Sequence, residues 1–432
     1  MMILLKMNGG TSMEVSKLRR DFHKHPELGF TEFRTASIIV EKLKALNYDV
    51  TYGKEVMEEA SRKGVPSEEL LIKSYNRALS DGANPDIIKE MEGGFTAVIG
   101  KLYGRKPGPT IAFRFDMDAL PIKESNESYH FPFKEKFHSI YDGIMHACGH
   151  DGHTAIGLSL AQAFKDCNFS GTLMLIFQPA EEGGRGAKTL VEKGVIDNVN
   201  KLYCMHLGLN VPFGEVSGGT YGWLATTKMK SRFVGVPSHS GATPEKGRNA
   251  LIGAATALLN IHGLPRNSGG KTRVNVGSLK GGSAPNIIPN EATMIIETRS
   301  DVASINKDLE KRVRKIVQHS ALMHDLDYEI ETIGEGTTII CDDDLVNIVV
   351  EEAQQIDAFH TVHHLCAGGG SEDASFLIER VQERGGKGTY LLVGTELSAP
   401  HHHSKFDVQE ESLELAVELL YRIAKRELNI NE

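Results

Sequence analysis

One cysteine and three histidines lie within the nine residues 145–153, which read MHACGHDGH. Gly149 separates Cys148 from His150, and its backbone freedom lets both side chains turn toward one point. Thiolate and imidazole groups bind Zn2+ and similar ions, and imidazole also binds Mn2+ when carboxylates complete the site. A lone Cys-x-His is more often a buried cysteine beside surface histidines, so the segment alone predicts no more than half of a metal site.

Two adjacent carboxylates, Glu181 and Glu182, are candidates for the other half. They stand in the segment QPAEEGG, and neighbouring like charges are costly for residues with a purely structural role; the alternative is a solvated acidic turn. We expect one glutamate to bind metal and the other to act as a general base on water. His206 and the run His401–His403 offer further imidazoles, although histidines at such places are often packed or exposed without a ligand.

Strand ends are expected to bring these residues together. Asp116, Glu181 and His206 each lie just beyond an apolar stretch that predicts a β-strand: IAFRF, LMLIF and KLYCM, respectively. The unbroken apolar run of residues 173–177 is typical of a central strand that is covered on both faces. Because sites in open α/β sheets form where strands end, the three side chains are expected to share one edge of a sheet. A helix is predicted from about Thr154 to Phe164.

The order of predicted strands and helices differs between two parts of the chain and so indicates two domains. After a polar helical insert in residues 52–91, strands and helices alternate, which predicts an α/β fold with a central mixed sheet flanked by helices. Residues 223–332 instead predict strand, helix, strand, strand, helix and strand, a ferredoxin-like α+β layout. We therefore predict a discontinuous domain of residues 1–222 and 333–432, interrupted by an inserted domain of residues 223–332.

Composition limits the class of protein. A chain of 432 residues with 40% hydrophobic and 24% charged residues is typical of globular proteins and too long for one ordinary core. The net charge of -9 argues against a nucleic-acid partner. Five cysteines without regular spacing favour a reducing compartment over a disulfide framework. The short apolar start and the lack of a membrane-length apolar stretch predict a cytoplasmic protein without a signal peptide.

Six motifs, in order along the chain, carry a family resemblance: RFDMDALP, MHACGHDGHTA, FQPAEEG, MHLG, SHSGATPEKGRNAL and HHSKFD. The set resembles the M20 metallopeptidase family, in its amidohydrolase branch of aminoacylases and hippurate hydrolases. Further stretches, among them HPELGFTEFRTA and GGSEDAS, strengthen the resemblance, which extends from about Lys17 to Arg422. It implies a zinc-peptidase-like catalytic domain with an inserted lid or dimerisation domain.

The resemblance implies a site with two metal ions. The implied ligands are Cys148, which bridges the ions, His150, Glu182, His206 and His402. The triple histidine leaves the last assignment open by one residue. Glu181 matches the general base. Asp116 matches a position that orients ligands, since Arg114 stands where the wider superfamily has a histidine ligand. His146 and His153 match supporting positions, and His153 is expected to begin the following helix.

The inserted domain and a glycine-rich loop contribute a second implied set. His239 matches a histidine that reaches across a dimer and stabilises the oxyanion. Asn286, Arg299, Gly370 and Ser371 match positions around the α-carboxylate of the substrate. An arginine suits this task because its planar fork pairs with both carboxylate oxygens. For Arg299 a strand-end salt bridge is the alternative.

The implied activity is metal-dependent hydrolysis of the amide bond of an N-acyl amino acid. The resemblance implies p-aminobenzoyl-glutamate as the substrate, with hippurate-like, N-acetyl and auxin-conjugate amino acids as alternatives. The alternative class is a non-catalytic or partner-dependent subunit. Family habit and the mixed nitrogen, oxygen and sulfur donors favour Mn2+, with Zn2+ and Co2+ as alternatives. The implied assembly is a homodimer, or a heteromer with a related subunit, through the inserted domain. Neither nucleic acid nor a membrane is expected as a partner.

Overall fold

The computed structural model describes residues 15–165 and 167–429, and these form two compact units. Unit 1 contains residues 15–221, 339–369 and 373–429, and unit 2 contains residues 222–338 and 370–372. The apolar start of the chain, on which the prediction of no signal peptide depends, lies outside the described residues. The five cysteines, all within the described ranges, form no disulfide. No helix in these ranges is long and apolar enough to cross a membrane.

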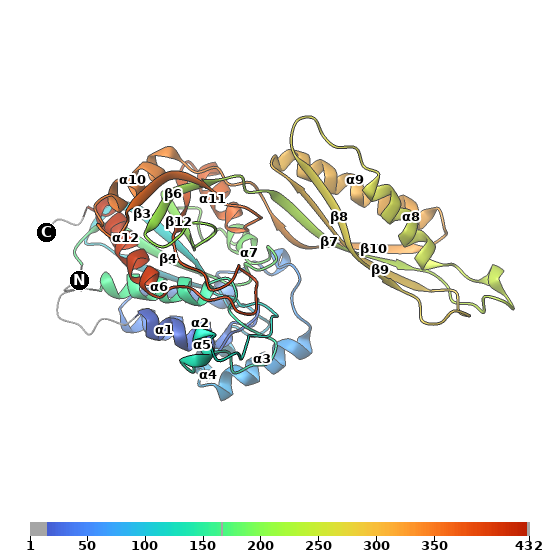
Figure 1. The fold of residues 1–432 in the computed structure, drawn as a ribbon, viewed down its shortest axis with the longest axis horizontal. Coiled ribbons are helices and arrows are strands. Elements are labelled where there is room, and N and C mark those ends of the chain that lie inside the picture. The colour runs from blue at the N-terminus through green and yellow to red at the C-terminus, as the bar shows by residue number, and fades with distance from the viewer. Residues whose placement is uncertain (1–14, 166, 430–432) are drawn as a thin grey trace. The chain divides into compact units, whose positions relative to one another are not determined.

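Unit 1 consists of strands, helices and two short 3-10 turns (Figure 1). Its strands are β1 (Asp49–Tyr52), β2 (Val98–Tyr103), β3 (Lys106–Asp116), β4 (Ser170–Gln178), β5 (Lys201–Leu207), β6 (Glu215–Tyr221), β11 (Thr361–Ala367) and β12 (Lys387–Val393). Its helices are α1 (Val15–Lys24), α2 (Phe33–Ala45), η1 (Gly53–Glu55), η2 (Glu59–Ser61), α3 (Glu68–Ser80), α4 (Pro85–Lys89), α5 (Phe131–Lys134), α6 (His150–Ala163), α7 (Ala187–Glu192), α10 (Asp343–Ala353), α11 (Ala374–Glu383) and α12 (Glu411–Glu427). The polar insert thus forms η1, η2, α3 and α4, as its helical spacing predicts.

The eight strands of unit 1 form one mixed sheet in the order β1-β2-β4-β3-β5-β12-β6-β11. The four neighbours β4, β3, β5 and β12 are parallel, whereas the β1–β2, β2–β4 and β12–β6 pairs are antiparallel. Residues 173–177 of β4 are all buried, as their unbroken apolar run predicts. A mixed sheet flanked by helices confirms the predicted α/β fold (Figure 1).

Helix α6 is the most deeply buried helix near the predicted ligands. It packs against α1, α2, α12 and strand β3, and residues 150–161 are all buried. The prediction that this helix begins near Thr154 is wrong, because it begins at His150. Gly149 adopts a left-handed backbone with a φ of 90° and so ends the preceding loop earlier than the sequence suggests. His150 is therefore the first residue of a rigid helix.

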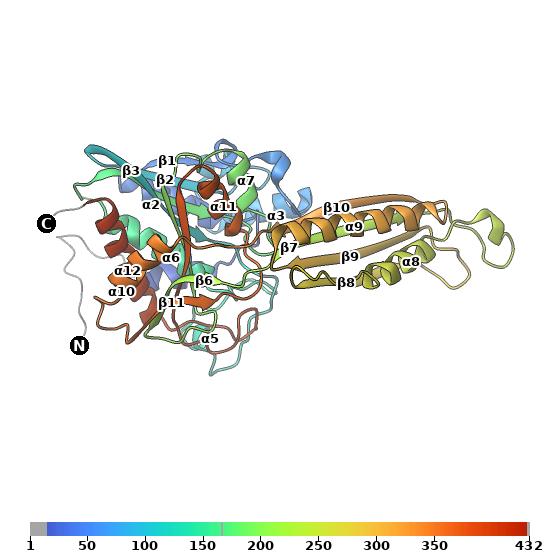
Figure 2. The same ribbon diagram turned by 90° about the horizontal axis from the view of Figure 1, so that it is seen from above.

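Unit 2 has the order of elements that the sequence predicts. These elements are β7 (Ala225–Val234), η3 (Pro244–Lys246), α8 (Ala250–His262), β8 (Thr272–Gly281), β9 (Glu291–Ser300), α9 (Ala303–Leu322) and β10 (Asp327–Gly336). The sheet is antiparallel in the order β10-β7-β9-β8. Helices α8 and α9 pack against each other and on this sheet, as in ferredoxin-like folds (Figure 2).

Strand β10 runs past the domain limit that we predict at residue 332. The segment IGEG looks like the end of a strand, but the chain passes a β-bulge between Thr332 and Gly334 and pairs with β7 up to Gly336. Residues 370–372 also group with unit 2. Such a long-range association has no local signal in the sequence.

Candidate metal centre and active site

The carboxyl ends of the parallel strands carry the candidate site. Asp116 is the last residue of β3, and His206 is the second-last residue of β5. Glu181 and Glu182 follow the end of β4, and residues 401–403 follow β12. Because these four strands are parallel, their carboxyl ends share one edge of the sheet. The predicted meeting of Asp116, Glu181 and His206 at one edge follows from this topology.

Two groups of potential ligand atoms share the Cys148 sulfur. In the first group, Cys148, His150 and Glu182 each offer one atom, and these atoms lie within 4.8 Å of one another. In the second group, Cys148 is joined by His206 and His401 within the same limit. Burial, and after it the charge of Glu182, raises the pKa of the Cys148 thiol. Two adjoining groups with one shared sulfur fit a pair of divalent ions.

His150 is held in the orientation of a metal ligand. Its Nδ1 lies 3.3 Å from Asp118 Oδ1, while its Nε2 is buried without a hydrogen-bond partner among the described residues. A carboxylate on one imidazole nitrogen fixes the ring and leaves the other nitrogen to an ion. Asp118 is therefore a site residue that the sequence analysis did not single out. The motif RFDMDALP contains both Asp116 and Asp118, and the path of the chain after β3 determines which of them contacts His150 Nδ1.

Asp116 hydrogen bonds His153 and also lies 3.8 Å from Nε2 of the implied ligand His150. Asp116 Oδ1 lies 2.6 Å from His153 Nδ1, and His153 Nε2 accepts a hydrogen bond of 3.1 Å from the Leu207 N–H. Both nitrogens of His153 are engaged, so this residue supports the site although it lies close to His150 and His206. It stands in the first turn of α6, which His150 begins, and not at the start of the helix as predicted.

Arg114 forms a buried ion pair with Asp116. Its Nη1 lies 2.7 Å from Asp116 Oδ2, and both side chains are fully buried. Burial alone would raise the pKa of Asp116, but the charges of His150, His153 and Arg114 hold it well below its usual value. Asp116 is thus an anion that pairs with Arg114 and hydrogen bonds His153.

Two neighbouring histidines flank the Cys148 sulfur. His401 Nδ1 lies 3.7 Å from Cys148 Sγ, and its Nε2 accepts a hydrogen bond of 3.4 Å from the Leu209 N–H. His402 Nε2 lies 3.2 Å from Glu182 Oε1, and its side chain is 53% exposed. Hydrogen bonds to Cys148 and to Glu182 raise the pKa of His402 to about 10. His401 therefore belongs to the second ligand group, whereas His402 contacts the first group through Glu182.

Glu181 and Glu182 occupy different places in the site. Glu182 belongs to the first ligand group, with Cys148 and His150. Glu181 lies outside this group, with its Oε2 4.0 Å from His150 Nε2. Both glutamate side chains are 12% exposed, so water reaches them. A carboxylate beside a ligand group, but not part of it, is placed to exchange a proton with water in the site.

A buried ion network joins the start of α6 to α1. Arg19 Nε lies 2.8 Å from Oδ2 of Asp151, the second residue of α6. His23 Nδ1 lies 2.8 Å from the same oxygen, and His23 Nε2 lies 3.0 Å from Glu124 Oε1. Burial lowers the pKa of His23, but Glu124 and Asp151 outweigh this effect and raise the pKa to about 9. His23 is therefore a buried cation at neutral pH.

We expect the His23 network to make the protein less stable in alkali. The pKa of His23 is raised from 6.5, so its contribution is fully present below about pH 6.5 and is lost as the pH rises through about 9. The free energy of unfolding, measured with urea, should fall from acid to alkaline pH by about 3 kcal/mol more in the wild type than in His23→Gln. An equal pH dependence of both proteins would contradict the assignment of a charged His23.

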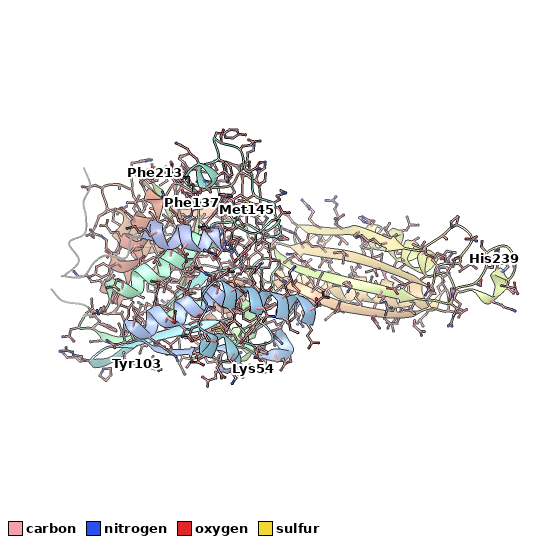
Figure 3. The ribbon with its side chains drawn as sticks, turned by 90° about the horizontal axis from the view of Figure 1, so that it is seen from below. Lys54, Tyr103, Phe137, Met145, Phe213 and His239 are labelled. Atoms are coloured by element: carbon pink, nitrogen blue, oxygen red, sulfur yellow. The ribbon has the colours of Figure 1, made fainter. Side chains whose placement is uncertain are left out.

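Two of the predicted substrate residues meet at one end of the unit 2 sheet. His239 forms an isolated β-bridge with Ile287, and the Ser240 N–H donates to the Asn286 carbonyl oxygen at 3.0 Å. His239 and Asn286 are both exposed, and Figure 3 shows His239 in a loop beyond the ends of the strands. The structure therefore brings His239 and the Asn286 segment together.

Arg299, Gly370 and Ser371 lie at the other end of this sheet. Arg299 pairs in register with Thr226 near the start of β7, and the N–H of residue 224 donates to the Gly370 carbonyl oxygen. Arg299 Nε lies 2.9 Å from Glu297 Oε2, which is the strand-end salt bridge named as the alternative. Strand β9 separates Arg299 from Asn286 by on the order of 25 Å, at about 3.3 Å per residue. One chain therefore cannot place both residues on the same carboxylate.

Thiolate, imidazole and carboxylate ligands beside a further glutamate suit the class of hydrolases that cut amide bonds with metal-activated water. The chain belongs to peptidase family M20/M25/M40, whose model matches residues 112–426. It is 42% identical over 410 residues to an indole-3-acetyl-aspartic acid hydrolase of Enterobacter agglomerans, with 94% of each chain covered. It is also 42% identical over 414 residues to one of the subunits of p-aminobenzoyl-glutamate hydrolase of Escherichia coli strain K12, with 95% of each covered.

A solved structure supports the same fold over nearly the whole chain. The aminobenzoyl-glutamate utilization protein of Klebsiella pneumoniae superposes with a TM-score of 0.82 at 37% sequence identity, and 95% of each chain is covered. Family and fold together make the chain an M20 hydrolase of carbon–nitrogen amide bonds.

Proposed function

We propose that this protein hydrolyses the amide bond between an aromatic acyl group and an acidic amino acid, with p-aminobenzoyl-glutamate as the preferred substrate. Two relatives of equal identity carry names that pair an aromatic acyl group with aspartate or with glutamate. The observation that carries the chemistry is the placement of Glu181 beside, and not within, the ligand group of Cys148, His150 and Glu182. Reaction at this site would yield p-aminobenzoate and glutamate, in the cytoplasm.

The two ligand groups are proposed to hold two divalent ions, with Cys148 shared between them. His150 and Glu182, joined by His402, would complete one coordination sphere, and His206 the other. The mixed donors favour Mn2+, with Zn2+ or Co2+ as alternatives. When bound, such ions polarise the amide carbonyl and make water more acidic.

Glu181 is proposed to carry the proton through the reaction. It takes a proton from the water that attacks the amide carbon, and then delivers this proton to the amide nitrogen as the carbon–nitrogen bond breaks. The amine leaves as the free amino acid, and the acyl group leaves as the carboxylic acid. His239 is proposed to donate a hydrogen bond to the developing oxyanion.

The substrate residues of unit 2 support a site that is completed by a second chain. Within one chain, Arg299, Gly370 and Ser371 lie at one end of the sheet and His239 with Asn286 at the other. If all of them serve one substrate, the two sets belong to two different chains, and we propose that His239 and Asn286 come from the partner. We propose that Arg299 binds the α-carboxylate, and that a homodimer, or a heteromer with a related subunit, forms through this lid unit.

A substrate panel tests the proposed function. Purified protein loaded with Mn2+ should hydrolyse p-aminobenzoyl-glutamate with a kcat/KM at least about tenfold above that of hippurate, because a difference of about 1.4 kcal/mol in transition-state binding gives this ratio. The rate of hydrolysis of indole-3-acetyl-aspartate shows whether the site accepts another aromatic acyl group and a shorter acidic amino acid. A preference for hippurate or for N-acetyl amino acids would contradict the proposed substrate and would favour one of the alternative N-acyl amino acid hydrolases. Binding of these compounds without any turnover would favour a partner-dependent subunit.

His402 and His401 provide a matched pair for the last ligand. We expect His402→Ala to lower the content of bound metal and to reduce kcat/KM by about 10- to 100-fold, because it removes a coordinating nitrogen. His401 also offers a nitrogen to the second ligand group and hydrogen bonds Leu209, but His401→Ala should retain more of the metal than His402→Ala does if His402 is the ligand. Metal analysis of both dialysed variants checks the prediction, and a larger loss in His401→Ala would reassign the ligand.

A further inference from the structure

The segment 27–32, ELGFTE, lies against the loop that carries Glu181. Gly29 approaches this loop so closely that a Cβ atom there would stand 2.9 Å from both Cα and Cβ of Ala180. Glu32, at the end of the segment, is fully buried. Its Oε1 accepts a hydrogen bond of 2.8 Å from the Ala180 N–H, and its Oε2 accepts one of 2.6 Å from the Thr96 hydroxyl. The resemblance assigns no role to this segment.

Two buried carboxylates accept three successive backbone N–H groups at this loop. Glu32 accepts from Ala180, while Asp118 Oδ1 and Oδ2 accept from the N–H groups of Glu181 and Glu182, each at 3.0 Å. Each of these buried N–H groups would lose its hydrogen-bond partner if the loop moved, so the bonds restrict the geometry of the loop. The direction in which each glutamate side chain leaves the backbone is therefore set by these two carboxylates.

Ala180 adopts a backbone conformation that needs such support. Its φ of 52° lies in the left-handed region, which non-glycine residues rarely adopt. Strained backbone of this kind persists only where the surroundings determine it. The Glu32 carboxylate and the close approach of Gly29 are among the contacts that hold Ala180 in this conformation.

We propose that Glu32 is a positioning residue for the hydrolytic reaction, which holds the Glu181 side chain in place through the Ala180 N–H. The proposal rests on the function of Glu181 proposed above. The Glu32 carboxylate bonds the Ala180 N–H and the Thr96 hydroxyl, and it belongs to neither ligand group, so its loss should act on the orientation of the base and not on metal binding. Asp118 performs the related task one residue further along, but it also contacts His150, so Glu32 is the cleaner residue to test.

Glu27 provides a matched control for Glu32. Its carboxylate is also buried, at 2% exposure, and accepts the N–H groups of Arg34 and Thr35 at 3.0 and 2.8 Å. It therefore supports the start of α2 rather than the Ala180 loop. Glu27→Ala and Glu32→Ala each remove a buried carboxylate with two N–H or O–H partners, but only Glu32→Ala releases Ala180.

The first measurement is amide hydrogen exchange of peptides that cover residues 179–183, in metal-free and Mn2+-loaded full-length protein. Glu32→Ala should speed exchange of these amides by about tenfold or more, because a buried N–H loses its partner. Glu32→Gln keeps an oxygen acceptor of the same reach and should stay within about threefold of the wild type. Glu27→Ala should leave this segment unchanged. Unchanged exchange in Glu32→Ala overturns the proposal whatever the substrate is.

The second measurement separates positioning from general damage. Glu32→Ala should lower kcat by about 10- to 100-fold, with KM and metal content unchanged, because a misplaced base loses the reacting geometry. Glu32→Asp withdraws the carboxylate by one methylene group and should have the same effect. It replaces the alanine variant in this test if that variant does not fold. Glu32→Gln should restore at least half of the wild-type kcat, and Glu27→Ala should retain kcat. Full kcat in Glu32→Ala or Glu32→Asp, or a loss of metal in proportion to activity in either variant, overturns the proposal. A wild type without hydrolase activity refutes the proposed function instead, and the exchange data remain decisive for Glu32.

Discussion

Replacing Glu181 with alanine is expected to abolish turnover while the protein keeps its metal ions. Glu181 lies outside the ligand group, with its Oε2 4.0 Å from His150 Nε2. Loss of a general base that also returns the proton to the leaving amine should reduce kcat by about 10²- to 10⁴-fold. Steady-state kinetics and metal analysis of the same preparation measure the two parts of this prediction.

Glu182→Ala is the companion variant with the opposite signature. Glu182 shares the first ligand group with Cys148 and His150, so its removal should lower metal content and activity together. Glu181→Gln keeps the size of the side chain without the base and should match Glu181→Ala. If the alanine variants of both glutamates lost metal equally, the division of roles between them would be refuted.

Replacing Cys148 with alanine should have an equally large effect for a different reason. Its sulfur is shared by the group of His150 with Glu182 and the group of His206 with His401. Removing it weakens both groups at once, so we expect loss of both ions and a fall in kcat/KM of at least about 10²-fold. Because burial raises the pKa of this thiol, metal uptake by the wild type should release a proton and weaken in acid.

A second cysteine gives the control for Cys148. Cys366 lies on the edge strand β11, away from both ligand groups, and Cys366→Ala should keep the metal and the activity of the wild type. Isothermal titration of metal-free protein with Mn2+ measures the number of sites in each variant. Retention of one full-affinity site in Cys148→Ala would show that the sulfur does not bridge two ions.

The sequence predicts which residues form the site better than it predicts which of them contact each other. Cys148, His150, Glu182 and His206 carry rare ligand chemistry at strand and helix ends, and the parallel sheet brings them together for topological reasons. Which aspartate orients His150 depends on the path of a few residues after β3, and this path has no periodic pattern. The motif indicates Asp116, which lies 3.8 Å from His150 Nε2, whereas Asp118 makes the closer contact at 3.3 Å.

Long-range placement is the part that no local pattern reveals. Asn286 and Arg299 are close in sequence, yet an extended strand holds them at opposite ends of unit 2. Glu32 lies in a segment whose motif is visible in the sequence, but its contact with Ala180 spans 148 positions of the chain. The ferredoxin-like order of unit 2 was predictable because alternation and helical spacing are local.

The most direct test of the central claim is hydrolysis of p-aminobenzoyl-glutamate by metal-free protein before and after addition of Mn2+, with released glutamate as the readout. We predict no release without metal, and release that rises until two ions per chain are bound. Hippurate, assayed in parallel, should be hydrolysed more slowly under the same metal dependence. Full activity in the metal-free protein, or no hydrolysis of either compound once two ions are bound, would contradict the account.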